Sequence, residues 1–140
     1  MSTCTIELDP KADPANARAI WDGLLAYNLQ HAPPDNHQDL VMVLRDEKGK
    51  LVGGLVGDTY WGWLYVRILW LEEAVRGQDY GSQLLKAAEE EAVHRGCKHS
   101  HLDTMSFQAL PFYQKHGYTI YGVLEDQPEG CQRYYLRKDL

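Results

Sequence analysis

The 140-residue sequence predicts an α/β or α+β fold built on one mixed sheet. Two observations support this prediction. Between residues 40 and 57, two apolar runs flank a turn sequence, which is typical of an antiparallel hairpin. From residue 64 onward, apolar runs of strand length alternate with segments of helical periodicity. A hairpin section followed by strand–helix–strand–helix–strand favours a mixed sheet covered by helices.

The N-terminal part is predicted to contain a short strand and a helix. Thr5–Leu8 is the strand candidate. Asp13 is placed as the N-cap of the helix, with Pro14 at its first position. Residues with a helical period continue it, namely Ile20, Trp21, Leu24, Leu25 and Asn28. Residues 31–37 contain two prolines and several polar turn formers, so we expect a loop there.

The hairpin is predicted over residues 40–57. Leu40–Leu44 is interpreted as a buried strand, residues 46–49 as a turn, and Leu51–Gly57 as the second strand. The second strand contains three glycines, Gly53, Gly54 and Gly57. Glycine weakens a strand and indicates a bulge or a close approach of two backbones.

The remaining elements follow in alternation. The apolar run Leu64–Leu71 is a strand, and a helix follows it, with Leu84, Leu85, Ala88 and Ala92 on one face and Gly96 as its stop. The later elements are a strand over Ser100–Thr104, a helix over Gln108–His116, and strands over Tyr118–Leu124 and Gln132–Leu136.

Residues 75–85, Val-Arg-Gly-Gln-Asp-Tyr-Gly-Ser-Gln-Leu-Leu, join the apolar strand to its helix. A glycine-bearing turn there exposes backbone N–H groups at the positive end of the helix dipole, which favours a phosphate or pyrophosphate. Tight packing alone is the equally weighted alternative for such a loop. No Gly-Lys-Ser/Thr follows and no G-x-G-x-x-G is present, which excludes a P-loop and a Rossmann fingerprint.

The loop resembles motif A of the GNAT acetyltransferases, Q/R-x-x-G-x-G/A. Arg76 and Gly81 match its first and last positions, and Asp79 replaces the middle glycine. Residues 109–118, Ala-Leu-Pro-Phe-Tyr-Gln-Lys-His-Gly-Tyr, are similar to the later A-x-x-x-Y-x-x-x-G-F/Y segment. The order of elements fits from about Asp39 to Leu136. The resemblance implies a GNAT-like fold, splayed open beside the strand before the loop, and we predict a single domain over residues 1–140.

The resemblance also implies an acetyl-CoA-dependent N-acetyltransferase. The acceptor would be a primary amine of a small molecule or an exposed protein amine. The implied cofactor residues are Arg76, Gly77, Gln78, Asp79, Tyr80, Gly81 and Ser82 for the diphosphate, the backbone of Leu69, Trp70 and Leu71 for the thioester carbonyl, and Gln108 for the CoA arm. A non-catalytic acyl-CoA-binding or regulatory module on the same fold is the alternative, and a partner protein without a cofactor is a third reading.

Tyr113 is the candidate catalytic residue, because the resemblance implies that it protonates the departing thiolate. The intrinsic pKa values of a phenol and a thiol lie within ~2 units of each other. A half-buried helix tyrosine is the alternative. Asp79 would place a negative charge near the pyrophosphate, at a cost on the order of 1 kcal/mol. We therefore expect weakened rather than lost affinity, and aspartate also adopts positive φ more readily than most residues.

The general base stays open. Glu72, Glu73, His101 and Asp103 are each interpreted as surface or structural residues, and a water chain is the alternative. His99 and His101 would share one face of a strand as a possible metal-ligand pair. No third ligand has a recognisable spacing, so no metal site is predicted.

Composition limits the partners. The net charge is −6 with no cluster of Lys or Arg, which argues against nucleic-acid binding and favours a cationic amine. No apolar stretch of ~18 residues exists, so no membrane helix is expected. Three widely spaced cysteines and the lack of a signal-peptide pattern indicate the cytoplasm. An edge strand near the C-terminus makes a homodimer possible.

Overall fold

The computed structural model describes residues 2–140 and divides the chain into two compact units. One unit ends at Pro34, and the other spans Asp35–Leu140. The expectation of one domain over the whole chain remains a prediction.

The first unit contains α1 (Pro14–His31). The Asp13 carboxylate caps it as expected by accepting a hydrogen bond from the Ala15 N–H at 2.9 Å. The strand expected over Thr5–Leu8 is wrong, because these residues form no regular element and the side chains of Ile6 and Leu8 are exposed. A strand needs a partner for its backbone groups, and no strand lies elsewhere in the described part of this unit.

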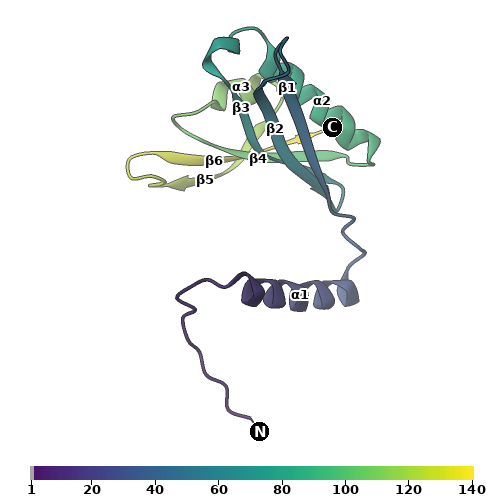
Figure 1. Cartoon of the computed structure of the whole chain (residues 1–140), viewed down its shortest axis with the longest axis vertical. Helices are drawn as coiled ribbons and strands as arrows, with labels where there is room; N and C mark the ends of the chain where they lie inside the picture. Colours follow the sequence, from purple (N-terminus) through teal and green to yellow (C-terminus); the bar gives the residue numbers. More distant parts are fainter. Residues whose placement is uncertain (1) are drawn as a thin grey trace. The chain divides into compact units, whose positions relative to one another are not determined.

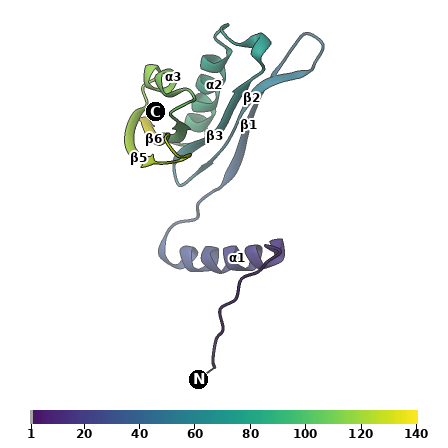
Figure 2. The same cartoon turned by 90° about the vertical axis from the view of Figure 1, so that its left-hand side faces the viewer.

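The second unit is built on a six-stranded sheet in the order β1-β2-β3-β4-β6-β5 (Figures 1 and 2). The strands are β1 (Gln38–Arg45), β2 (Leu51–Tyr60), β3 (Trp63–Leu71), β4 (His99–Met105), β5 (Thr119–Glu125) and β6 (Gln132–Asp139). β3 and β4 pair in parallel, and the other neighbours are antiparallel. The mixed sheet and the predicted order of elements from the hairpin onward are therefore confirmed.

The hairpin glycines lie where backbones approach closely. A Cβ at Gly54 would come within 2.5 Å of the Met42 carbonyl oxygen, and one at Gly57 would overlap that of Tyr65. The β2–β3 register also shifts between Val56 and Gly57, so both the bulge and the close approach are confirmed. The predicted burial of β1 is wrong on one face. Val41 is 58% and Val43 49% exposed, because in the described structure only the face carrying Leu40 packs on the core.

Two helices and one short 3-10 helix complete the unit. They are η1 (Glu73–Val75), α2 (Tyr80–His94) and α3 (Leu110–Lys115). α2 lies against one face of the sheet (Figures 1 and 2) and buries the four predicted apolar residues Leu84, Leu85, Ala88 and Ala92. Gly96, at φ +89°, follows its C-terminus as predicted. α3 is shorter than expected and begins at Leu110. The Gln108 side chain belongs to the preceding turn, where it accepts a hydrogen bond from the Met105 N–H at 2.8 Å.

β3 and β4 diverge part-way along their length. Their pairing covers only Trp63–Val66 and His99–Leu102. The rest of β3, through Leu71, remains paired with β2 alone. This divergence confirms the expected splay, and it leaves an opening in the sheet directly before the turn that leads to α2. None of the described helices has the length and apolar character needed to cross a membrane.

Candidate active site

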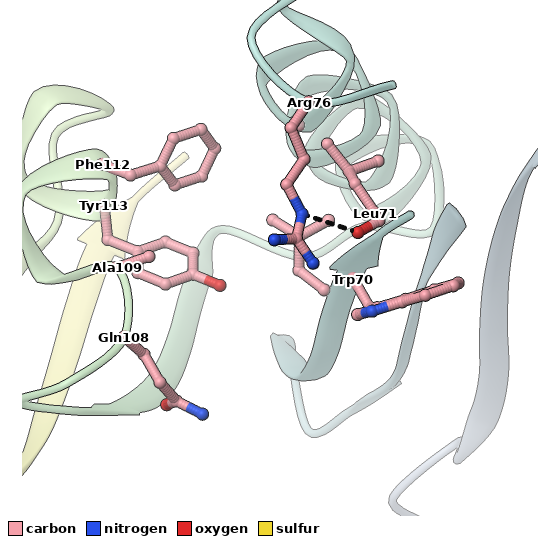
Figure 3. Close-up of a pocket in the computed structure, with 9 residues that line it drawn as sticks. Trp70, Leu71, Arg76, Gln108, Ala109, Phe112 and Tyr113 are labelled. Carbon is pink, nitrogen blue, oxygen red and sulfur yellow. Dashed lines mark hydrogen bonds between the residues drawn. The ribbon is translucent and has the colours of Figure 1, made fainter. Parts of the chain in front are cut away.

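The opening between β3 and β4 forms a cavity of about 350 Å³. It is bounded by the end of β3, the start of α2 and the segment around α3 (Figure 3). Its lining is Leu69, Trp70, Leu71, Arg76, Gly81, Gln108, Ala109, Phe112 and Tyr113. Seven of the predicted site residues, from two separate sequence motifs, therefore meet in one cavity.

Arg76 is fixed at the mouth of this cavity. Its Nε donates a hydrogen bond to the Leu71 carbonyl oxygen at 2.9 Å, drawn as a dashed line in Figure 3. The bond holds the guanidinium beside the end of β3, where its terminal nitrogens are available to an anion. An arginine presented in this way offers charge and paired donors to a phosphate group.

The turn before α2 presents free backbone donors. The N–H groups of Tyr80, Gly81 and Ser82 begin the helix and have no acceptor among the described residues. A Cβ at Gly81 would meet the Phe112 ring at 3.5 Å, an ordinary contact, so packing does not require glycine there. These observations support an anion seat at the start of α2 rather than a turn built for packing alone, and its free donors and the adjacent Arg76 fit a diphosphate.

Asp79 is the N-cap of α2 and has a left-handed backbone, with φ 69° and ψ 9°. Its exposed carboxylate makes no capping hydrogen bond, which is unusual for aspartate at this position. The left-handed backbone at this position explains the middle glycine of the family motif, because glycine adopts a positive φ without strain. Aspartate adopts the same φ, but at a cost in free energy. Gly77, at φ +75°, has the second left-handed backbone in this turn.

The other predicted turn residues lie outside the cavity lining. The Gln78 side chain is exposed and donates to the Ala74 carbonyl oxygen at 3.4 Å. Ser82 Oγ forms a hydrogen bond with His116 Nε2 at 2.8 Å, which ties α2 to the end of α3. Sequence reasoning missed His116, because its partner lies 34 positions away.

Tyr113 lies on α3 and is 8% exposed. Its hydroxyl points into the opening (Figure 3) and has no hydrogen-bond partner in the described structure. Burial, with a smaller contribution from the negative charge of Asp103, raises the pKa of Tyr113 to about 12. The phenol is therefore protonated at neutral pH and available as a donor. A thiolate in the same cavity is also desolvated, so its proton affinity rises in the same direction.

Gln108 precedes α3 and lines the cavity (Figure 3). Its Oε1 accepts from the Met105 N–H and from Thr104 Oγ1, at 2.8 and 3.3 Å. These bonds fix the orientation of the amide and leave its NH₂ group free to donate. An amide held in this way suits the polar groups of an extended ligand arm.

The comparisons with known proteins agree with this geometry. Residues 5–118 match the model of the acetyltransferase (GNAT) family. The chain belongs to this family. An acetyltransferase of Agrobacterium fabrum is 41% identical over 131 residues, which cover 94% of the chain and 96% of that relative. Blasticidin-S acetyltransferase of Streptomyces morookaense is 42% identical over 95 residues, covering 67% of the chain and 70% of that enzyme.

A crystal structure of an acetyltransferase from Bacillus cereus is similar over 98% of both chains, with 36% identity and a TM-score of 0.89. The GNAT fold is thereby confirmed. Family membership makes the chain an acyltransferase whose acyl donor is acetyl-CoA.

The candidates for a general base differ in their surroundings. Glu72 is paired with Lys50 at 3.3 Å and Glu73 is exposed on η1. Asp103 accepts two hydrogen bonds from Arg133 and a third from Tyr65. These three carboxylates are therefore either already paired or exposed to solvent. His101 differs from them, because its ring nitrogens have no hydrogen-bond partner among the described residues.

His99 and His101, the possible ligand pair for which no metal site is predicted, both pack against one indole ring. The Trp63 ring contacts both imidazoles, with centroids 4.6 Å from His99 and 5.6 Å from His101. His99 Nδ1 is also bound to Asp139 Oδ1 at 2.7 Å. An indole in contact with both rings and an acidic partner on one of them account for the two histidines without a metal ion.

Proposed function

We propose that the protein transfers the acetyl group of acetyl-CoA to a primary amine of a small cationic molecule. The diphosphate would lie on the free N–H groups of residues 80–82 and against Arg76. The thioester carbonyl would lie beside the backbone of Leu69–Leu71, and Tyr113 would donate a proton to the departing sulfur. One observation supports this assignment above the others. Gly81, with its free N–H at the start of α2, and Tyr113, with its unpaired hydroxyl, line one opening in the sheet.

Two features support a small cationic acceptor. The net charge of −6 attracts cations. A relative that is 42% identical is named blasticidin-S acetyltransferase, and it acts on a small molecule. An exposed protein amine is the second class of acceptor. A screen of antibiotics, polyamines, amino acids and peptide N-termini, read by release of free CoA, distinguishes the two classes. Faster turnover on peptides than on every small amine would contradict the proposal.

Binding of acetyl-CoA can be tested without knowing the acceptor. At about 100 times its dissociation constant, the ligand should stabilise the fold by ~2.7 kcal/mol. The measurement is a thermal melt with acetyl-CoA, with ATP as a control for unspecific anion binding. No shift with acetyl-CoA, or an equal shift with both, would count against the assigned seat.

The alternative of a non-catalytic acyl-CoA-binding module rests on Asp79 at the motif's middle position alone, and family membership argues against it. Such a protein would bind acetyl-CoA in the melt but release no CoA with any amine. The two functions are therefore separated by the screen and the melt together.

We further propose a cytoplasmic location and a homodimer. The three cysteines Cys4, Cys97 and Cys131 are all free, which supports a reducing compartment. β5 is an edge strand with exposed apolar side chains, including Ile120 and Val123, which favours pairing with a second copy. Light scattering on the purified protein tests the dimer, and a monomeric mass at micromolar concentration would contradict it.

A further inference from the structure

A row of polar and aromatic side chains crosses the sheet on the face opposite α2. Asp58 of β2 pairs with Tyr65 of β3, Tyr65 with His101 of β4, and His101 with Arg137 of β6. Directly paired residues share a face, so these four side chains lie side by side. A second cavity, of about 380 Å³, adjoins the row and is lined by Trp63, His101, Tyr121 and Arg137.

His101 is held between aromatic rings but keeps its ring nitrogens free. Its imidazole stacks on Tyr65, with centroids 4.8 Å apart and planes 14° apart, and meets the Trp63 ring edge-on. No hydrogen bond to either ring nitrogen exists within the described residues. Burial lowers the pKa of His101, against the opposing negative charges of Asp58 and Asp103. The ring is therefore neutral at pH 7, with one lone pair open to the cavity.

Two carboxylates and three arginines surround this imidazole. Asp58 is almost fully buried, and its Oδ1 has no hydrogen-bond partner. Its Oδ2 accepts from Arg67 at 3.0 Å and lies 3.4 Å from His37 Nε2. Asp103 lies two residues along β4 on the same face and is held by Arg133. Arg137 faces from β6 and is paired with Asp139 at 3.2 Å. The buried carboxylates stabilise the imidazolium that forms if His101 takes up a proton.

Asp103 connects this cavity to the opening between β3 and β4. Its negative charge adds to the raised pKa of Tyr113 and opposes the lowering of the His101 pKa by burial. It also accepts a hydrogen bond from the Tyr65 hydroxyl at 3.1 Å. The charge of one carboxylate therefore acts on both His101 and Tyr113.

We propose that His101 is the proton acceptor for acetyl transfer, and that the acceptor amine enters through the cavity of Trp63, His101, Tyr121 and Arg137. This inference rests on the proposed function. As the amine nitrogen bonds to the acetyl carbon, it loses one proton to His101. The carbon–sulfur bond breaks, and its electron pair leaves with sulfur, which takes the Tyr113 proton. His101 then releases its proton to solvent, and Tyr113 regains one, so that no charge accumulates.

The first test compares His101→Gln with His99→Gln. The two histidines lie on the same face of β4, but His99 is bound to Asp139 and does not line the cavity. His101→Gln should lower kcat roughly 10²–10⁴-fold without changing acetyl-CoA binding, and His99→Gln should turn over near the parent rate. At acid pH, kcat/KM of the parent should rise with the square of hydroxide concentration, because both amine and imidazole must be neutral. It should rise only linearly in His101→Gln.

The second test needs no turnover. The ring of His101 is titrated by NMR in the unliganded parent and in Asp58→Asn. We expect a pKa below the ordinary value of 6.5 in the parent, and a still lower one in the variant, because a negative charge is lost. Asp103→Asn is the second variant, in case the buried Asp58 is needed for folding.

The outcomes separate the two claims. Turnover that survives in His101→Gln, or a His101 pKa that neither carboxylate variant lowers, overturns the inference and leaves the acetyltransferase function intact. If the parent acetylates no amine at all, the proposed function fails and the inference fails with it.

Discussion

Arg76 Nε and the Leu71 carbonyl oxygen are 2.9 Å apart, and this hydrogen bond ties the turn between β3 and α2 back to the end of β3. It sets the cation at the mouth of the cavity in which the acyl donor is proposed to lie. The bond also occupies one donor of the guanidinium and aims the others. Position as well as charge therefore makes Arg76 suited to a diphosphate.

Arg76→Gln should weaken acetyl-CoA binding, because charge-assisted hydrogen bonds contribute roughly 1.5–3 kcal/mol. Isothermal titration measures the dissociation constant. Arg45→Gln is the matched control, since Arg45 also bonds a backbone carbonyl, that of Gly49 at 3.1 Å, in the β1–β2 hairpin. Equal affinities in parent and Arg76→Gln would remove Arg76 from the site.

Gly81→Ala separates the two interpretations of the turn. Alanine fits against Phe112 at 3.5 Å and favours a helix, so the melting temperature should hold or rise. The added methyl group points into the cavity lining, so acetyl-CoA should bind more weakly. Gly23→Ala in α1, where no atom lies within 4 Å of the new methyl group, is the control. Unchanged acetyl-CoA affinity in Gly81→Ala would favour a turn that serves packing alone.

Asp79→Gly should bind acetyl-CoA more tightly, by something on the order of 1 kcal/mol or about fivefold. It should also stabilise the fold, because glycine adopts the observed φ of 69° without strain. Asp79→Asn removes the charge but keeps a side chain at that φ, so it reports the charge alone. Added salt should reduce the difference between parent and Asp79→Asn. Weaker binding in both variants would show that the carboxylate supports the site.

Tyr113→Phe should lower kcat roughly 10²–10⁴-fold with little change in acetyl-CoA binding. Because the pKa of Tyr113 is about 12, the parent should show no alkaline loss of kcat from this group below that pH. Tyr118→Phe is the matched control. Tyr118 is a buried neighbour whose ring centroid lies 6.0 Å away and whose hydroxyl bonds Ser100 and Glu89. That variant should lose stability but keep turnover, whereas equal kcat in parent and Tyr113→Phe would make Tyr113 structural.

The raised pKa of Tyr113 also affects stability. Between pH 10, the ordinary value, and about pH 12, the unfolded chain loses this proton before the folded one does. The free energy of unfolding should therefore fall as the pH rises through this window. Urea unfolding at pH 8 and 11 measures the loss, and it should be smaller in Tyr113→Phe than in the parent.

Local patterns were enough to predict the elements around the site. The turn glycines, the apolar face of α2 and the Asp13–Pro14 cap each depend on neighbours in the sequence, and the structure has all three. The prediction of a strand at Thr5–Leu8 was wrong, because a strand forms only when a second strand pairs with it. The residues of a segment do not by themselves specify that partner.

Contacts between distant segments could not be predicted. The row from Asp58 to Arg137 depends on three successive strand registers, and one residue of slip would turn His101 into the core. The hydrogen bond between Ser82 and His116 likewise needs α2 and α3 in place. For this reason, sequence reasoning could suggest Tyr113, which lies in a local motif, but not a base.

Amine-dependent release of CoA from acetyl-CoA tests the central claim most directly. The parent protein is mixed with acetyl-CoA and a panel of small cationic amines, and free thiol and acetylated amine are measured together. We predict equal amounts of both products with at least one amine, and a strong loss of both in Tyr113→Phe. Tight acetyl-CoA binding with no release of CoA for any amine would contradict the account and favour a binding module.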